Sequence, residues 1–474
     1  MFMIKLYKRI DYFKEICVFK KLLSKSTLIM FLFDLITFVL SSAYWYYNFN
    51  LPVEHMDIAV LLTTLTGIIV LFLKDNYKIR EFNSTLKNSY LLFEGVVFSQ
   101  IPATILLLTF NQNVKSFEFI LFNLLTIYAA LFIYRRCFHY YLFNIKKIKN
   151  VLIIGSNSNA KLIADEIINK KALRMNVSGF VEYDEEDKII NDTNIQVFPK
   201  VYELDEIIKN KKVDIVIVAI KHRMEEEFLT KMVNSIPKDV KVYKMPEFYE
   251  MVTGKYFVDR MSINWLFYDY MKNRSRIYDF CKRAYDIIAA LIILVVTSPI
   301  LLYIGIRVKL TDGGNAIYTQ NRVGKDGKVF KAYKLRTMYA NDYVPKAGQI
   351  GHTEPQDEDN RVIPFCKFVR KARFDEIPQM INILKGEMSI VGPRTEWEDL
   401  VNIYSKEIPY YSCRMWVKTG WTGWAQINQG HCVLADDVSE KLQYDLYYLK
   451  HRNLLWEIGI LIKAVFLALG GRHG

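Results

Sequence analysis

The sequence predicts three parts: a membrane α-helical N-terminal domain, an α/β Rossmann-like domain, and a second α/β domain tied to the membrane by an apolar helix of its own. Three observations predict this order. Long apolar runs crowd residues 1–147, strand and helix patterns alternate over 148–250, and another apolar run covers residues 285–309. A hydrophobic content of 51% in 474 residues agrees with a chain that lies partly in a bilayer.

Four apolar segments in the N-terminal part are long enough to cross a bilayer. They predict a domain of four transmembrane helices at residues 1–147, with spans over 27–47, 56–73, 89–110 and 117–134. Two acidic residues, Asp34 and Glu94, fall inside these spans. They either mark a polar pathway or are packed structural groups, and the sequence leaves both readings open.

The basic residues indicate the orientation of this domain. They gather before the first span, between the second and third, and after the fourth, whereas the loops at 48–55 and 111–116 hold only Lys115. By the positive-inside bias, both ends of the domain lie in the cytoplasm. The same bias accounts for the net charge of +13, and no separate basic helix or aromatic platform indicates a nucleic-acid partner. Six scattered cysteines lack metal-ligand spacing and are expected to be reduced thiols.

Residues 148–250 alternate strands and helices as parallel α/β units do. The turn after the first strand keeps the opening Gly155 but lacks the later glycines that let a backbone approach a pyrophosphate. We therefore favour a structural or regulatory role over dinucleotide binding. Residues 251–273 read as a linker.

The apolar run at 285–309 is interrupted by Ser298 and Pro299 and has basic residues at both ends. A proline removes one helix hydrogen bond and bends the helix, and a serine hydroxyl can satisfy the freed carbonyl. A fifth spanning helix is the alternative, but it would place the basic residues of 310–474 outside the cell. We therefore predict a re-entrant helix hairpin that leaves the domain at 274–474 on the cytoplasmic face.

The segment at 370–394 sets two adjacent carboxylates, Asp375 and Glu376, among the basic residues Arg370, Lys371, Arg373 and Arg394. A carboxylate attacks phosphorus only if it is ionised, held in line and relieved of repulsion from the phosphate oxygens. A divalent cation and guanidinium groups provide that relief. The segment therefore indicates a site for a metal and a phosphate.

Ordinary helix capping is the alternative reading of the acidic pair. Pro378 fits only the first turn of a helix, and the apolar residues after the pair form a helical stripe of Phe374, Ile377, Ile381 and Leu384. The two readings are compatible, since a helix N-terminus also favours ionised carboxylates and binds phosphate.

The surrounding motifs decide between these readings. Before the acidic pair, residues 317–330 read as a strand, a KDGK turn and a second strand. The chain resembles the bacterial polyprenyl-phosphate sugar-1-phosphate transferases of the large monotopic type in its motifs KRAYDI, Ser298-Pro299, QNRVG, FKAYKLRTM, FVRKARFDEIPQMINILKGEMSIVGPR and GWTGWAQIN. The resemblance covers nearly the whole length. It is least specific in the first two domains, which membrane-bound sugar-nucleotide dehydratases share.

The resemblance implies an undecaprenyl-phosphate sugar phosphotransferase of the inner membrane that starts capsule, exopolysaccharide or O-antigen units. Asp375 attacks the sugar-bearing phosphate of a UDP-sugar, UMP leaves, and undecaprenyl phosphate takes the sugar-1-phosphate from the aspartyl intermediate. Glu376 holds Mg²⁺ (or Mn²⁺). The phosphates are bound by basic residues among Arg336, Arg370, Arg394, Lys334 and Arg322. Membrane lipid is a further partner, and a homodimer is compatible with the sequence.

Three residues depart from the family pattern: Cys366 stands where glycine is usual, Arg373 where serine is common, and Thr419 where proline is expected. None removes a catalytic group, although Arg373 can alter the ionisation of Asp375. Two other functions stay open. One is a non-catalytic scaffold or regulator of polysaccharide assembly, and the other is a sugar-nucleotide dehydratase, which needs a second glycine-rich loop that the sequence after residue 270 lacks.

Overall fold

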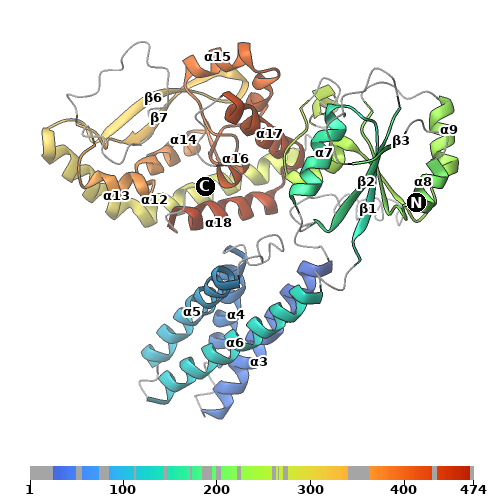
Figure 1. The fold of residues 1–474 in the computed structure, drawn as a ribbon. Coiled ribbons are helices and arrows are strands. Elements are labelled where there is room, and N and C mark those ends of the chain that lie inside the picture. Colours follow the sequence, from blue (N-terminus) through green and yellow to red (C-terminus); the bar gives the residue numbers. More distant parts are fainter. Residues whose placement is uncertain are drawn as a thin grey trace. The chain divides into compact units, whose positions relative to one another are not determined.

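The computed structural model describes residues 25–49, 56–73, 85–110, 114–141, 147–170, 173–183, 195–198, 204–220, 226–258, 263–264, 266–268, 270, 276–339, 362–429 and 435–469. The basic N-terminal arm, the basic loop at 74–84 and parts of the expected linker lie outside the described residues. Contacts divide the chain into two units, Met1–Thr253 and Gly254–Gly474. Figure 1 labels the elements of both.

Four helices occupy the four predicted apolar segments: α3 (Lys25–Asn48), α4 (Met56–Leu73), α5 (Thr85–Phe110) and α6 (Val114–Tyr140). Their shared core contains Phe38, Leu71, Val96, Ile127 and Leu131. By length and composition, Ile29–Asn48 of α3 and Phe117–Phe138 of α6 could each cross a membrane. The helical N-terminal domain is thus present.

The carboxylate of Asp34 is a packed structural group. Arg135 Nη2 donates to Asp34 Oδ2 at 2.7 Å, and the two side chains are 1% exposed or less. The sequence does not reveal this pair, because Arg135 also fits the basic flank that follows the fourth apolar span. Glu94 lies half-buried in α5.

Replacing Asp34 by Leu is expected to destabilise the helical domain by about 3–5 kcal/mol, because a buried arginine then loses its countercharge. The double variant Asp34→Leu/Arg135→Leu is expected to recover most of that loss. Thermal unfolding in detergent measures both. A single variant as stable as the wild type would show that the pair does not hold the helices together.

The predicted parallel α/β domain follows in the same unit. Its five strands form one parallel sheet in the order β3-β2-β1-β4-β5. The elements are β1 (Lys149–Ile154), α7 (Ser158–Asn169), β2 (Met175–Val181), β3 (Val197–Phe198), α8 (Leu204–Asn210), β4 (Ile215–Val218), α9 (Glu226–Ser235), β5 (Lys241–Lys244) and α10 (Met245–Thr253). Strand alternation with helices predicted this Rossmann-like arrangement, but the two-residue β3 was too short to detect.

The side chain of Asn157 occupies the hydrogen-bonding groups of the turn after β1. Asn157 Oδ1 accepts from the backbone N–H groups of Asn159 and Ala160, and Asn157 Nδ2 donates to the carbonyl of Ala219. Gly155 has φ 112°, and a Cβ there would stand 3.0 Å from that same carbonyl. The helix N–H groups that would meet a pyrophosphate in a dinucleotide site are therefore already capped.

The second unit consists of short strands and 3₁₀ turns set against long helices (Figure 1). Its elements are α12 (Arg276–Asp312), β6 (Ile317–Val323), η7 (Lys325–Gly327), β7 (Val329–Leu335), α13 (Cys366–Lys371), η9 (Phe374–Gln379), α14 (Met380–Lys385), β8 (Ser389–Val391), α15 (Glu398–Glu407), η10 (Tyr411–Trp416), β9 (Gly420–Thr422), α16 (Trp424–Asn428), α17 (Ala435–His451) and α18 (Leu454–Leu469). The predicted hairpin is confirmed as the antiparallel pair β6–β7. The described strands of this unit form two-stranded sheets only, which removes support for a second dinucleotide fold.

Helix α12 is one helix of 37 residues with Pro299 inside it. Ser298 Oγ donates to the carbonyl of Val295 at 2.8 Å, the carbonyl that the missing N–H of Pro299 leaves free. The predicted role of the serine is confirmed. The helix continues through Pro299 without a break. The re-entrant helix hairpin expected at 285–309 therefore stays a prediction.

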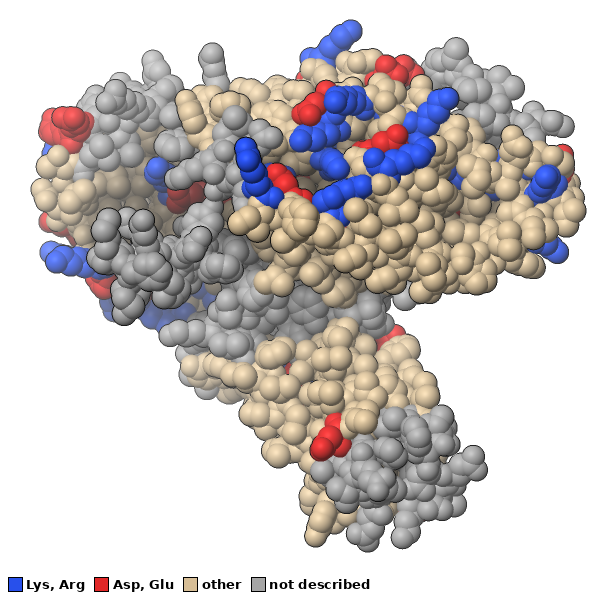
Figure 2. Space-filling view, turned by 180° about the vertical axis from the view of Figure 1, so that it is seen from behind, with Lys and Arg blue, Asp and Glu red and all other residues tan. Residues whose placement is uncertain are grey.

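Both ends of α12 contact the same folded unit. Near its start, Asp286 accepts from the backbone N–H of Ile390 in β8. Near its end, Ile304 and Val308 pack in one core cluster with Ile363. Between these contacts the helix exposes large apolar side chains: Ile288, Leu291, Ile292, Val295, Val296, Ile300, Leu302 and Tyr303. Figure 2 shows a broad face of this unit without charge, below a gathering of lysines and arginines.

Helix α18 has both buried and exposed apolar side chains. Trp456, Glu457 and Ile460 are buried in the unit, whereas Leu455, Ile462 and Val465 are exposed. Glu457 accepts from the hydroxyls of Tyr278 and Tyr448, so the C-terminal helix is joined to α12.

Candidate active site

The two adjacent carboxylates lie on the 3₁₀ turn η9, between the short helices α13 and α14. The expected single helical stripe is partly wrong, because Ile381 is 40% exposed and the buried positions are Ile377, Met380 and Ile383. A 3₁₀ turn has three residues per turn, so it shifts which side chains face the core. The residue before the turn, Arg373, has a left-handed backbone with φ 57°.

Glu376 is held between two cations. Lys334 Nζ, from β7, donates to Glu376 Oε1 at 2.9 Å, and Arg394 Nη2 donates to the same oxygen at 2.8 Å. The side chain is nearly buried, at 8% exposure. Burial alone would raise the pKa of Glu376, but Arg394 and Lys334 outweigh burial and hold the pKa well below its ordinary value. Glu376 is therefore ionised and fixed.

Asp375 differs from Glu376 in both its ion pairing and the direction of its pKa shift. Among the residues that the structure describes, it has no ion-pair partner. Burial and the neighbouring charge of Glu376 raise the pKa of Asp375 to about 6, although Lys334 and Arg370 pull it the other way. Two carboxylates side by side thus have pKa values pushed apart, a pattern typical of sites in which they do different chemistry.

The departure at Arg373 adds a further cation to this group. Burial and the nearby Arg394 lower the pKa of Arg373, while Glu376 and Asp375 oppose that shift. Its left-handed backbone is unusual for a residue with a side chain. The sequence motif showed the charge but not this strained conformation.

Arg394 reaches Glu376 because its loop packs backbone to backbone against the strand β9. Gly420 N donates to the carbonyl of Pro393, and Gly392 N donates to the carbonyl of Thr422. A Cβ on Gly420 would stand 2.1 Å from Gly392 N. Only glycine allows this approach, which explains the glycines of the GPR and GWTGW motifs.

The start of α12 holds two segments that follow the carboxylates in the chain. Arg283 donates to the carbonyls of Ile383 and Leu384 at the end of α14, at 2.6 and 2.7 Å. Asp286 accepts from Ser389 Oγ and the N–H of Ile390 in β8, which leads to Arg394. The motif KRAYDI contains both residues, yet its spacing alone gave them no role.

Two other predicted phosphate ligands, Arg370 and Arg322, interact electrostatically with groups of this site. Arg370, on α13, is close enough to lower the pKa of Asp375. Arg322 donates to the carbonyl of Thr395, and burial together with Arg394 lowers the pKa of Arg322 to about 10. The side chain of Lys371 lies outside the described residues.

Arg336 is engaged at the end of α12. It donates to Asp312 through both terminal nitrogens and to the carbonyl of Asn315 at 2.6 Å, with longer contacts to the carbonyls of Val308 and Met338. These contacts occupy its donors without a phosphate. Its assignment to substrate stays an untested prediction.

Two family models match the chain. The bacterial sugar transferase model matches residues 277–471, and the CoA-binding domain model matches residues 73–246. The first covers nearly all of α12, the β6–β7 hairpin and the acidic pair, and the second covers the parallel sheet.

Several curated proteins are similar to part of this chain. The UDP-N-acetylgalactosamine-undecaprenyl-phosphate N-acetylgalactosaminephosphotransferase of Aeromonas hydrophila is 38% identical over 49% of this chain and 53% of that protein. The UDP-glucose:undecaprenyl-phosphate glucose-1-phosphate transferase of Escherichia coli K12 is 39% identical over 40% of this chain and 39% of that protein. The chain thus spans about half, or less, of the length of these two relatives.

A shorter relative is matched over most of its length. The UDP-glucose:undecaprenyl-phosphate glucose-1-phosphate transferase of Caulobacter vibrioides is 32% identical over 40% of this chain and 69% of that protein. The family model covers the unit that carries Asp375 and Glu376. The chain therefore belongs to the bacterial sugar transferase family.

Proposed function

We propose that this chain transfers a sugar-1-phosphate from a UDP-sugar to undecaprenyl phosphate, releasing UMP and forming a lipid-linked sugar diphosphate. The names of the similar proteins support the acceptor and the class of reaction. The single observation that carries the proposal is the contrast within the acidic pair, where a cation-bound Glu376 adjoins an Asp375 with no ion-pair partner in the described chain.

The proposed reaction has two displacements at one phosphorus atom. A carboxylate oxygen of Asp375 bonds to the sugar-bearing phosphorus of the donor, and the bond to the bridging oxygen breaks, so UMP leaves with that electron pair. A phosphate oxygen of undecaprenyl phosphate then attacks the same phosphorus. The aspartyl oxygen leaves and the free carboxylate is restored. Arg394, Lys334 and Arg370 offset the negative charge of the phosphates.

The carboxylates present fit a divalent cation such as Mg²⁺ or Mn²⁺ only together with substrate. The described residues contain no group of three or more potential metal-ligating side chains. Mg²⁺ commonly binds one or two carboxylates plus substrate phosphates, which matches Glu376 beside a diphosphate. When bound, the ion would neutralise charge on the diphosphate.

Removing divalent cations with EDTA is expected to lower UMP release by at least about 100-fold, because the basic side chains alone would then have to offset the diphosphate charge. Mg²⁺ added in excess should restore the rate. Full activity in EDTA would show that the basic side chains suffice.

We propose that the enzyme works on the cytoplasmic face of a bacterial inner membrane and carries out the first membrane step of capsule, exopolysaccharide or O-antigen synthesis. Four N-terminal helices span the bilayer, and α12 enters and leaves through one leaflet. The apolar face of α12 and the contacts of both its ends with one unit support this placement. Cysteine labelling of the C-terminus in intact cells tests it, since labelling from outside would place the unit on the wrong face.

The rate is expected to rise with pH around the pKa of Asp375. The pKa is about 6 and the ionised form is the nucleophile. The value of kcat/KM at pH 5 should therefore be about tenfold lower than at pH 7, and it should be constant above pH 7. The profile of kcat/KM for UMP release measures this. A rate independent of pH between 5 and 7 would contradict the assignment.

The direct test is UMP release with undecaprenyl phosphate, Mg²⁺ and a panel of UDP-hexoses and UDP-N-acetylhexosamines. Release that depends on the acceptor lipid supports the proposal and identifies the sugar. If folded protein released UMP from no donor, the scaffold or regulator alternative would be favoured.

A further inference from the structure

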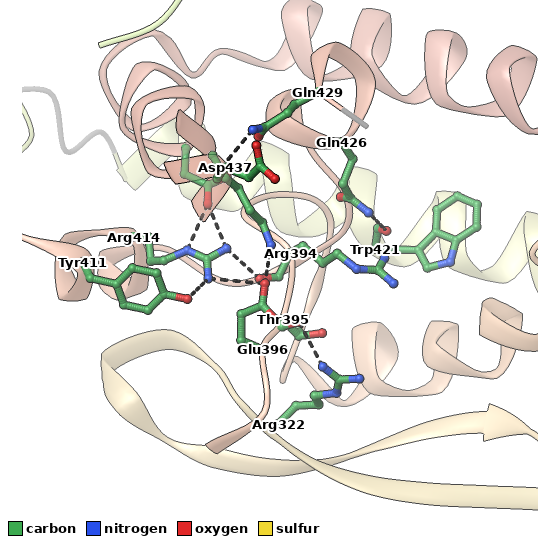
Figure 3. Close-up of polar contacts among 12 residues, drawn as sticks. Arg322, Arg394, Thr395, Glu396, Tyr411, Arg414, Trp421, Gln426, Gln429 and Asp437 are labelled. Carbon is green, nitrogen blue, oxygen red and sulfur yellow. Dashed lines mark hydrogen bonds and ion pairs between the residues drawn. The ribbon is translucent and has the colours of Figure 1, made fainter. Parts of the chain in front are cut away.

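The loop that carries Arg394 is fixed at three consecutive carbonyl oxygens. The carbonyl of Arg394 accepts from Arg414 Nη2 at 2.9 Å, that of Thr395 from Arg322 Nη1 at 3.3 Å, and that of Glu396 from Val323 N at 3.1 Å. Figure 3 shows Arg414 and Arg322 approaching this loop from different elements. The direction in which the Arg394 side chain leaves the backbone is thereby determined.

Arg414 is itself held rigidly. Its Nε donates to Asp445 Oδ2 at 2.9 Å, and its Nη1 donates to Tyr411 Oη at 2.7 Å. Arg414 and Asp445 are 4% and 1% exposed. Because a guanidinium is planar, these two bonds fix the direction of the N–H that reaches the carbonyl of Arg394. The ammonium of a lysine has no such plane.

Helix α17 supports the loop at a second point. Lys441, one turn before Asp445, forms an ion pair with Glu396. Lys441 and Asp445 therefore lie on the same side of α17 and hold the two ends of the segment Arg394–Glu396, one directly and the other through Arg414.

Arg394 needs this support because it has two tasks. Its guanidinium binds Glu376, yet its side chain remains 33% exposed, which leaves it accessible to a phosphate. A shift of about 1 Å in a binding group can cost about 100-fold in rate. Small movements of the loop would therefore matter.

We propose that Arg414 is a positioning residue for the phosphate-binding Arg394, acting through the Arg394 backbone carbonyl and anchored on α17 by Asp445. The inference rests on the proposed function. Arg414 does not touch the carboxylate pair in the described structure, so its effect on the reaction passes through Arg394.

The test is a double-mutant cycle of Arg414→Lys with Arg394→Lys, read by kcat for UMP release. Arg414→Lys alone is expected to lower kcat by about 30- to 100-fold, but by less than about threefold when Arg394 is already lysine. Arg452→Lys is the matched control, because Arg452 lies over Tyr270 and Tyr278 instead, and it should leave kcat unchanged. Equal losses in both backgrounds, or no loss in the first, would overturn the proposal.

Hydrogen–deuterium exchange provides a readout that does not need activity. Arg414→Lys should speed exchange in a peptide covering 392–396 and leave a peptide from α14 unchanged. Asp445→Asn, which keeps the shape of the side chain, should act in the same direction and serves if Arg414→Lys fails to fold. Unchanged exchange at 392–396 in a folded variant would reject the positioning role, whereas a wild type that releases no UMP would reject the proposed function instead.

Discussion

Replacing Asp375 by Asn is expected to reduce UMP release at least about 10⁴-fold while the protein stays folded. The amide keeps the shape of the side chain but cannot supply a carboxylate nucleophile, and the adjacent Glu376 is already bound by Lys334 and Arg394. Steady-state assays with the preferred UDP-sugar measure the loss. Wild-type turnover in Asp375→Asn would reject Asp375 as the nucleophile.

The same substitution is expected to stabilise the fold above pH 6. The folded-state pKa of Asp375 is about 6, higher than its ordinary value of 3.8. The folded protein therefore loses stability as the pH rises from 3.8 through 6 and the carboxylate ionises. Asn removes that cost, and a gain of about 1–3 kcal/mol is expected at pH 8. Glu376→Gln is the matched control and should destabilise, because it leaves Lys334 and Arg394 without their carboxylate.

Gly420→Ala is expected to have the largest structural effect of any single methyl group in the catalytic unit. The added Cβ would lie 2.1 Å from Gly392 N and 2.4 Å from the carbonyl of Thr422, where only backbone could move. The loop that carries Gly392 and the strand β9 must separate, which moves Arg394 away from Glu376. We expect a loss of at least about 3 kcal/mol in stability and at least about 100-fold in kcat.

Gly459→Ala is the control for that prediction. Gly459 lies in α18, and a Cβ there meets no atom within 4 Å. It should keep full activity and gain up to about 1 kcal/mol, since alanine is the better helix former. Thermal unfolding and UMP release, measured on both variants, separate the two expectations. A Gly420→Ala protein as stable and active as the control would show that the loop and β9 do not pack as described.

Much of the fold follows from local patterns. Apolar length predicted α3 to α6 and α12, strand and helix alternation predicted the parallel sheet, and the KDGK turn predicted the β6–β7 hairpin. These features depend on neighbours in sequence. The 3₁₀ geometry of residues 374–379 was not predicted, because the left-handed backbone at Arg373 is set by the surrounding fold.

The site was predicted only in part, since contacts between distant residues decide it. The sequence identified Asp375, Glu376, Lys334 and Arg394, which the structure brings together. It could not show that Asp312 would engage Arg336, because Asp312 carries no motif of its own. Arg414 and Asp445 were missed for the same reason, as they are 31 residues apart and meet only in the folded unit.

The most direct test of the account is to look for the sugar phosphate on Asp375. Protein mixed with its UDP-sugar and Mg²⁺, without acceptor lipid, is quenched and digested for mass spectrometry. The account predicts release of about one UMP per active site and a peptide containing Asp375 that carries the added sugar phosphate, which undecaprenyl phosphate then removes. UMP release that occurs only when the acceptor is present, with that peptide never modified, would contradict it.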